Sequence, residues 1–99
     1  MKKYVYLEKE DGVLIAHHII ATNRLEVKEK TGVCIDNIYS KDLLLKVNNW
    51  LGKRGKTLVF SDKYDVSINY DNGRIHYFES FVEFRNIVSE YRERWYKWQ

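Results

Sequence analysis

The sequence predicts an α+β domain in which a mainly antiparallel sheet of four to five strands is covered on one face by two amphipathic helices. Two observations predict this class: two β-rich segments are interrupted by hairpin turn signals, and two segments, over 41–51 and 81–98, have apolar residues at helical spacing. The chain of 99 residues is long enough for one domain, spanning 1–99. Its 44% hydrophobic and 31% charged residues are typical of a globular protein.

The N-terminal segment "KYVYLEKEDGVLIAHHIIA" predicts a β-hairpin. Asp11-Gly12 separates two β-rich runs, and this dipeptide is favoured in two-residue hairpin turns. The second run, Val13–Ala21, is almost continuously apolar, which predicts a strand that is covered on both faces.

The next segment, "TNRLEVKEKTG", fits either a short helix or a polar strand. A helix is favoured, because Thr22 or Asn23 can cap its start and Gly32 can end it. The segment "VCIDNIY" that follows is expected to form one short strand.

The first of the two amphipathic helices is expected from Ser40 through Leu51. Ser40 is a suitable N-cap, Asp42 is favourable in the positive first turn, and Gly52 is a suitable stop. The residues expected to pack on the sheet are Leu43, Leu44, Val47, Trp50 and Leu51.

A strand "TLVF" and a second hairpin, "DVSINYDNGRIHYF", are expected next. Asn72-Gly73 predicts a two-residue type I′ turn. Pairing outward from such a turn opposes Asp71 with Arg74, Tyr70 with Ile75 and Ile68 with Tyr77. One face of the hairpin would then collect Val66, Ile68, Tyr70, Ile75 and Tyr77.

The last element is expected to be a helix over 81–98. The sequence "SFVE" is a capping box, in which Ser80 caps the helix and Glu83 reaches back to the cap. The helix has a continuous apolar stripe made of Phe81, Phe84, Val88, Tyr91, Trp95 and Trp98.

The stretch "GKRGKT", Gly52 to Thr57, is similar in composition to a phosphate-binding P-loop but differs from it in glycine spacing and in the order of the flanking helix and strand. A P-loop has four residues between its first glycine and the Gly-Lys-Ser/Thr end, whereas only two separate Gly52 from Gly55. The stretch also ends a helix and opens a strand, the reverse of the P-loop order. Nucleotide hydrolysis is therefore not expected, and Lys53, Arg54 and Lys56 form either a solvated connector or a loop that contacts nucleic-acid phosphates.

No catalytic or metal-binding constellation stands out, so neither an enzyme nor a cofactor is expected. His17 and His18 are adjacent on a strand and therefore point to opposite faces, and no ligand spacing joins them to Cys34 or His76. The single cysteine is expected to be a small buried hydrophobe and not a nucleophile, although Asp36 is nearby in the sequence.

The end of the chain, "YRERWYKWQ", is the feature that most suggests a binding function. Two tryptophans near a chain terminus would expose much apolar area unless they pack on their own domain or on another chain, and Trp, Tyr and Arg are enriched at interface hot spots. The expected interface residues are Tyr91, Arg92, Arg94, Trp95, Tyr96 and Trp98.

Charge and composition limit the partners. The net charge of +3 is compatible with nucleic acid but does not require it. No apolar run approaches the length of a membrane span, the N-terminus does not have the pattern of a signal peptide, and one cysteine permits no internal disulfide. An intracellular setting without membrane association is therefore expected.

In composition the chain resembles the small orphan proteins of archaeal filamentous viruses and, less closely, of bacteriophages. It is short, proline-free and rich in Tyr, Trp, Lys and Ile, as in "MKKYVYLEKE" and "YRERWYKWQ". The resemblance covers no alignable motif and transfers no site residue. It implies a protein of the host cytoplasm or the virion that is often dimeric and often without known activity.

Two functional hypotheses follow from the sequence. The first is a non-enzymatic accessory protein that forms a homodimer or binds a host or virion protein through its aromatic C-terminal helix. The alternative is a nucleic-acid-binding protein that uses the basic loop over 52–57 and the basic end of the last helix, with Lys53, Arg54, Lys56 and Lys97 as contacts.

Overall fold

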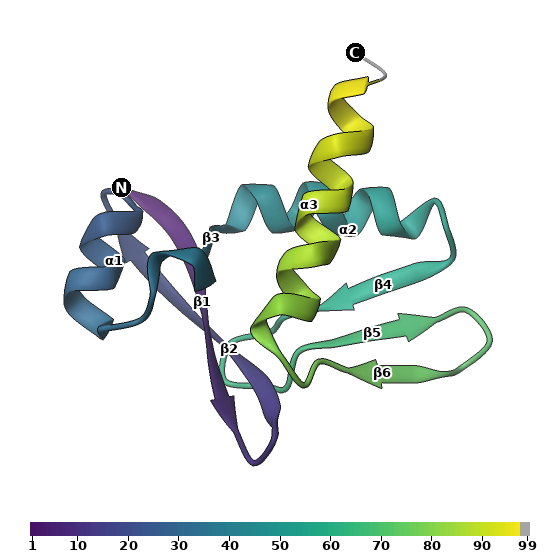
Figure 1. Ribbon diagram of the computed structural model, residues 1–99, viewed down its shortest axis with the longest axis horizontal. Helices are drawn as coiled ribbons and strands as arrows, with labels where there is room; N and C mark the ends of the chain where they lie inside the picture. Colours follow the sequence, from purple (N-terminus) through teal and green to yellow (C-terminus); the bar gives the residue numbers. More distant parts are fainter. Residues whose placement is uncertain (98–99) are drawn as a thin grey trace.

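The computed structural model describes the backbone of residues 1–97 and the side chains of residues 1–94. It is an α+β fold with two three-stranded antiparallel sheets (Figure 1). In chain order the elements are β1 (Lys2–Glu10), β2 (Val13–Ala21), α1 (Arg24–Thr31), the 3₁₀ turn η1 (Ile35–Asn37), β3 (Ile38–Ser40), α2 (Lys41–Gly52), β4 (Lys56–Val59), β5 (Ser67–Tyr70), β6 (Ile75–Tyr77) and α3 (Phe81–Lys97).

The predicted class is confirmed, whereas the expected single sheet of four to five strands and the count of two helices are wrong. The described residues form six strands and three α-helices, and the strands divide into the sheets β2-β1-β3 and β4-β5-β6. The sheets are joined by a short bridge in which Leu14 N–H donates to Phe78 O at 2.9 Å and Val66 N–H donates to Leu14 O at 2.9 Å. Two further backbone bonds extend this contact along β2: Ala16 N–H donates to Tyr64 O at 3.2 Å, and Lys63 N–H donates to Ala16 O at 2.7 Å.

The first hairpin forms as predicted. Glu10 pairs with Val13, and the two intervening residues have positive φ angles, 50° at Asp11 and 82° at Gly12, as a type I′ turn requires. The expectation that β2 is covered on both faces is wrong, because Leu14 and Ala16 on one face are buried, whereas Val13, Ile15, His17 and Ile19 on the other face are only half-buried.

The second hairpin forms with a different register from the one predicted. Tyr70 N–H donates to Arg74 O at 2.8 Å, so the loop has three residues, and Gly73 at φ 89° occupies its left-handed position. Ile68 consequently pairs with His76 and not with Tyr77. A shift of one residue moves every side chain of β6 to the other face, so Tyr77 and its neighbour Ile75 are exposed.

The helices begin close to the predicted positions. At α1 the favoured helix is confirmed, with the Asn23 side chain accepting from Glu26 N–H at 2.9 Å and Gly32 in the left-handed C-cap conformation. At α2, Ser40 Oγ accepts from Leu43 N–H at 3.1 Å. The segment expected to be one strand over 33–39 instead contains η1 and enters a strand only at Ile38.

Two details at the helix ends differ from the prediction. Gly52 is the last residue of α2 and has no positive φ, and the chain leaves the helix through a turn that ends at Gly55, whose φ is 74°. At α3, Ser80 Oγ accepts from Glu83 N–H at 3.2 Å, but the Glu83 carboxylate pairs with His76 Nε2 instead of completing the capping box.

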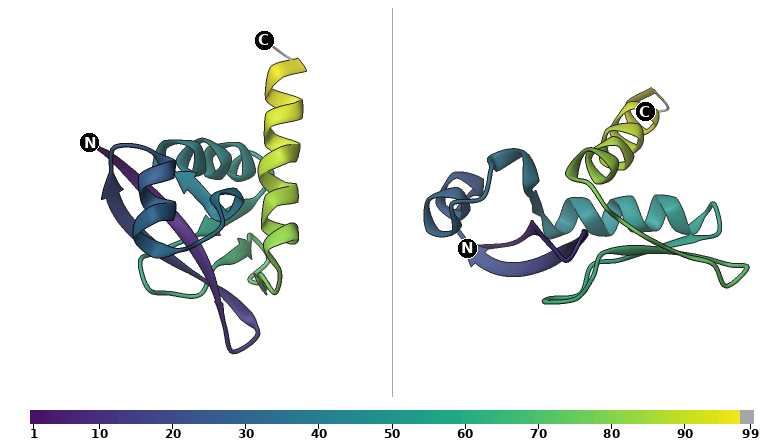
Figure 2. Two further views of the ribbon diagram at one scale, coloured as in Figure 1. Left: turned by 60° about the vertical axis from the view of Figure 1, so that its left-hand side comes forward. Right: turned by 60° about the horizontal axis from the view of Figure 1, so that its bottom comes forward.

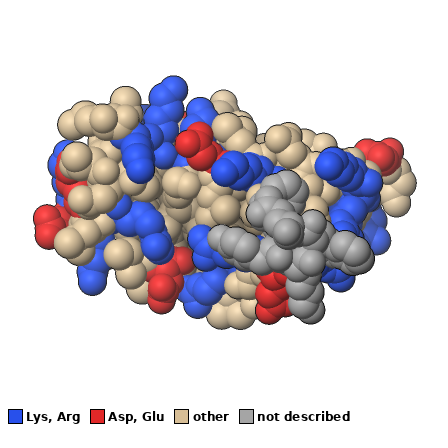
Figure 3. All heavy atoms as spheres, turned by 90° about the horizontal axis from the view of Figure 1, so that it is seen from above, with Lys and Arg blue, Asp and Glu red and all other residues tan. Residues whose placement is uncertain are grey.

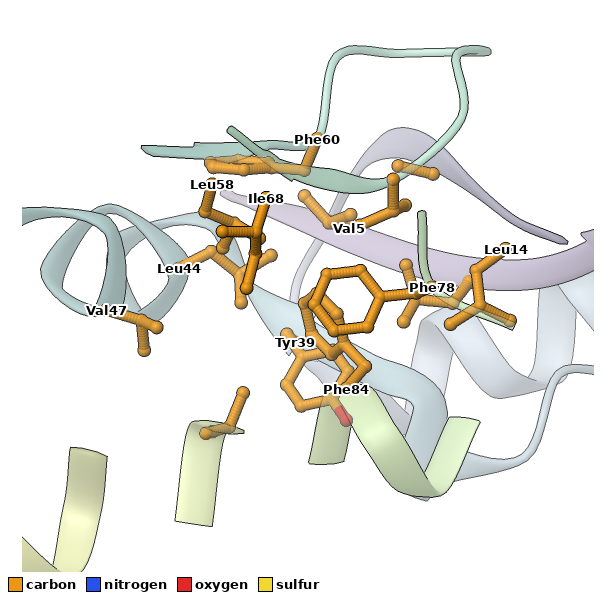
Figure 4. Packing of buried hydrophobic residues seen from close by; sticks show 14 of the residues in the cluster. Val5, Leu14, Tyr39, Leu44, Val47, Leu58, Phe60, Ile68, Phe78 and Phe84 are labelled. Atoms are coloured by element: carbon orange, nitrogen blue, oxygen red, sulfur yellow. The ribbon is translucent and has the colours of Figure 1, made fainter. Parts of the chain in front are cut away.

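One main core lies between the sheets, α2 and α3. Figure 4 shows Tyr39, Phe78 and Phe84 packed together in it, with apolar side chains of α2 and the second sheet alongside. A smaller cluster under α1 consists of Tyr4, Ala21, Val27 and Ile38. α3 crosses α2, and its last turns extend beyond the rest of the domain (Figures 1 and 2).

Candidate nucleic-acid interface

The basic loop between α2 and β4 lies against the turn between β5 and β6 (Figure 1). Asp71 N–H donates to Gly55 O at 3.0 Å, which joins the two turns. The Asn48 side chain, which accepts from Leu58 N–H at 2.8 Å, also holds β4 against α2. The loop is therefore attached at both ends to ordered elements, and its cations have defined neighbours.

Three cations of this region lie over aromatic rings. The Arg54 guanidinium carbon is 4.6 Å from the centroid of the Trp50 ring. On the second sheet, Lys56 Nζ and the Arg74 guanidinium carbon lie 5.7 Å and 4.8 Å from the centroid of Tyr70. Such contacts hold a cation near a ring face through the electrostatic attraction of the π-system. The result is a surface on which positive charge alternates with aromatic rings.

These side chains line a groove of about 320 Å³ between the end of α2, the second sheet and α3; we name it the basic-aromatic groove. Its residues are Trp50, Leu51, Arg54, Lys56, Ile68, Tyr70, Arg74, His76, Glu83, Ile87 and Glu90. Figure 3 shows Lys and Arg side chains at the end of the molecule where the two turns lie.

The two carboxylates of the groove are both engaged. Glu83 pairs with His76, and Glu90 Oε1 lies 3.3 Å from an Arg94 guanidinium nitrogen in an i,i+4 pair of α3. Because each of these acids has a basic partner of its own, Arg54, Lys56 and Arg74 carry the outward positive charge of the groove. Among the described residues, none of these three cations forms an ion pair.

The predicted nucleic-acid residues are therefore brought together in part. Arg54 and Lys56 both line the basic-aromatic groove, whereas Lys53 is exposed outside it, and the side chain of Lys97 lies outside the described residues. Sequence reasoning missed Tyr70 and Arg74 as site residues. The hairpin turn between them was recognisable, but its proximity to the α2–β4 loop comes only from the tertiary fold.

The residues expected at a protein interface include one buried side chain, two exposed side chains and three that lie outside the described side chains. Tyr91 is only 5% exposed and packs against Trp50, so it belongs to the core and does not present a free surface. Arg92 and Arg94 are exposed on α3. The side chains of Trp95 and Tyr96, and the whole of Trp98, lie outside the described residues.

The other residues considered for catalysis or metal binding are Cys34 and the histidines. Cys34 is exposed, so the expectation of a buried cysteine is wrong. His17 stacks on Tyr6 with ring centroids 5.0 Å apart, and the Nε2 atom of His18 lies 2.6 Å from Phe60 O. Within residues 1–94, no group of three or more His, Cys, Asp or Glu side chains could hold a metal ion.

No helix in the part of the chain that the structure describes is long and apolar enough to cross a membrane. Comparisons of the chain with protein-family models, with curated proteins and with solved structures found no match.

Proposed function

We propose that this chain is a non-enzymatic binding protein that holds single-stranded nucleic acid in the basic-aromatic groove. The observation that carries the proposal is the placement of Arg54, Lys56 and Arg74 over the rings of Trp50 and Tyr70. Cations beside partly exposed rings suit a single strand, because the cations contact phosphates while the rings stack on bases.

The aromatic rings of the groove also favour a single strand over a duplex. In a duplex the base faces are stacked on one another, so Trp50 and Tyr70 could contribute little. A single strand presents its bases for stacking, which contributes about 1–3 kcal/mol per base. The small positive net charge of +3 is consistent with a ligand held by a few local cations.

The test is fluorescence anisotropy with short labelled DNA and RNA strands of mixed sequence, over a range of salt concentrations. Contacts from three cations predict a slope of log K against log salt of about −2. Affinity should then fall roughly tenfold or more between about 50 and 200 mM salt. Arg54→Ala should weaken binding and reduce the size of that slope by about 0.7, since it removes one phosphate contact.

Tyr70→Leu and Lys9→Ala are the matched variants. Tyr70→Leu should weaken binding without changing the salt slope, because it removes a stacking ring and no charge. Lys9→Ala removes the same charge as a groove lysine but lies beside the β1–β2 turn, so binding should be unchanged. The proposal fails if wild-type protein shows no salt-sensitive binding at micromolar concentration, or if Lys9→Ala weakens it as much as Arg54→Ala.

A second candidate function is self-association or protein binding through the C-terminal end of α3. The observation that favours it is the extension of the last turns of α3 beyond the domain, with Arg92 and Arg94 exposed there (Figure 2). A helix end that projects from a domain can pack against a second copy or another protein. This function suits the small viral accessory proteins that the chain resembles in composition.

Light scattering over a series of protein concentrations, at low and high salt, tests this second candidate. A dimer formed by the helix end should grow with concentration and respond little to salt. Truncation after Arg94 keeps Phe84, Val88 and Tyr91 in the core and should give a folded monomer. A wild-type monomer at every concentration, or a dimer that persists after truncation, would count against the helix end.

A further inference from the structure

A second cavity lies on the opposite side of α3 from the basic-aromatic groove. Its volume is about 230 Å³, and it is bounded by α1, η1, β3, the start of α2 and α3. Arg24, Arg85 and Arg92 enter its wall from two different helices, together with Tyr39 and Ser40. We name this cavity the arginine pocket.

Among the described residues, the three guanidinium groups have no carboxylate partner. Arg24 donates from Nε to Ile38 O at 3.0 Å and from a terminal nitrogen to Ile35 O at 2.6 Å. Arg85 donates to Asn37 Oδ1 at 3.1 Å. These acceptors are neutral, so they position the cations without cancelling their charge. Asp36 also lines the pocket, but among the described residues it forms no ion pair with any of the three.

Two buried polar atoms of the pocket residues have no hydrogen-bond partner among the described residues. They are the hydroxyl of Tyr39 and Nε of Arg85. Tyr39 is only 6% exposed, and Figure 4 shows its ring beside Phe84 with the oxygen directed towards α3. A buried donor without an acceptor is unfavourable, since it has lost its bonds to water. Both atoms are donors, and an acceptor in the pocket would satisfy them.

The charges of all three arginines act on this hydroxyl. Burial raises the pKa of Tyr39 above its ordinary value, and the nearby positive charges of Arg85, Arg24 and Arg92 oppose that rise. Of the effects that oppose the rise, those of the nearby Arg85 side chain come first. The three arginines and Tyr39 thus line one cavity.

The N-terminus of α2 adds to the positive charge around the arginine pocket. Ser40, the N-cap of this helix of 12 residues, lines the pocket, and the first turn of a helix carries a partial positive charge. Arginine side chains and a helix N-terminus are the groups that proteins use to hold phosphate.

We propose that the arginine pocket binds a phosphate group, either as inorganic phosphate or at the end of a mononucleotide. Oxygen atoms of the anion accept from the Arg85 and Arg92 guanidinium groups and from the Tyr39 hydroxyl. The cavity is smaller than the roughly 300–1,000 Å³ of pockets that enclose drug-sized molecules, so it admits the phosphate and leaves any attached nucleoside outside.

The test is isothermal titration calorimetry of the full chain with inorganic phosphate and, in a second arm, with adenosine 5′-monophosphate, in chloride of matched ionic strength. Wild-type protein should bind phosphate. Arg92→Gln and Tyr39→Phe should each weaken binding about tenfold, because each removes a hydrogen bond to a charged oxygen. Tighter binding of the mononucleotide would identify it as the source of the phosphate group, and equal binding would show that the pocket recognises phosphate alone.

Two controls keep a folding defect from imitating a binding defect. Arg94→Gln removes one positive charge from the same helix, outside the pocket, and should leave phosphate affinity unchanged. Without phosphate, Tyr39→Phe should melt close to the wild-type temperature, since its hydroxyl has no hydrogen-bond partner in normal geometry among the described residues. No binding of either ligand by wild-type protein at millimolar concentration, or equal affinity in wild type, Arg92→Gln and Tyr39→Phe, would overturn the proposal.

The proposal stands apart from strand binding in the basic-aromatic groove. Arg54→Ala should weaken nucleic-acid binding and leave phosphate binding intact, whereas Arg92→Gln should have the larger effect on phosphate. A loss of both activities in both variants would overturn the assignment of two separate sites.

Discussion

The rings of Trp50 and Tyr91 pack edge to face, with centroids 5.8 Å apart and planes inclined at 68°. This contact joins the end of α2 to α3 and closes the core beneath the basic-aromatic groove. Edge-to-face aromatic pairs contribute about 0.5–1.5 kcal/mol beyond the burial of their area. The orientation of α3, and with it one wall of the groove, therefore depends on Tyr91.

Tyr91→Ala should destabilise the protein by roughly 3 kcal/mol, because it removes a buried aromatic ring from the core. For a domain of this size, each kcal/mol corresponds to a decrease in melting temperature of about 4–8 °C. Thermal unfolding followed by circular dichroism measures the change. Val82→Ala on the same helix is the control, since Val82 is 57% exposed and should change stability by at most about 0.5 kcal/mol. Similar melting temperatures for the two variants would contradict the placement of Tyr91 in the core.

Two glycines of the basic loop should respond to alanine in opposite directions. Gly52 is the last residue of α2, has no positive φ, and would place its new Cβ in open space. Gly52→Ala should therefore stabilise the protein by about 0.5–1 kcal/mol. Gly55 has φ 74°, and its Cβ would approach Asp71 Oδ2 at 2.8 Å. Gly55→Ala should cost about 1–2 kcal/mol because a left-handed conformation is unfavourable with a side chain. Urea denaturation distinguishes the two, and stabilisation by both would contradict the observed end of α2.

The register of the second hairpin predicts unequal roles for two isoleucines. Ile68 on β5 is 3% exposed and Ile75 on β6 is 52% exposed. Ile68→Ala should cost about 2–5 kcal/mol, as expected for a buried aliphatic side chain. Ile75→Ala should cost about 1 kcal/mol or less. Each variant is the control for the other in chemical denaturation. Equal losses would support the two-residue turn in place of the observed three-residue loop.

Asp62 should contribute to the loss of stability in acid. Its pKa is lowered chiefly because its carboxylate accepts a hydrogen bond from the backbone N–H of His18, at 2.8 Å. A lowered folded-state pKa means that the contribution is fully present above the unfolded-state value of about 3.9 and is lost as the pH falls through the folded-state value. Asp62→Asn should be less stable than wild type at neutral pH, and the difference should vanish in acid. Denaturation from about pH 7 to about pH 2 measures this, and a difference that stays constant over that range would refute it.

Elements that depend on local signals could be predicted from the sequence. Asp11-Gly12 forms the predicted two-residue turn, because residues that tolerate positive φ determine that turn locally. Ser40 caps α2 and Ser80 caps α3 for the same reason, since a cap bonds only to its own first turn. The apolar stripe of α3 also places Phe84 and Val88 in the core, as its helical spacing indicates.

The sequence does not predict correctly those features for which a local contact competes with a contact to a distant part of the chain. Asn72-Gly73 can form a two-residue or a three-residue loop; the latter forms, and Asp71 N–H donates to Gly55 O of the α2–β4 turn at 3.0 Å. Glu83 could complete the α3 capping box, but His76 on the adjacent strand takes its carboxylate. In both cases a partner distant in the sequence competes with the local one, and only the folded chain brings that partner near.

The candidate sites show the same division. The α+β class, the basic character of the loop with Arg54 and Lys56, and the aromatic character of α3 can be derived from the amino-acid sequence. Tertiary structure alone decided that Tyr70 and Arg74 join that loop, and that Arg24, Arg85 and Arg92 surround one cavity. The reason is physical: turns, caps and apolar periodicity act within a few residues, whereas a binding surface is assembled from side chains that meet only when the core has packed.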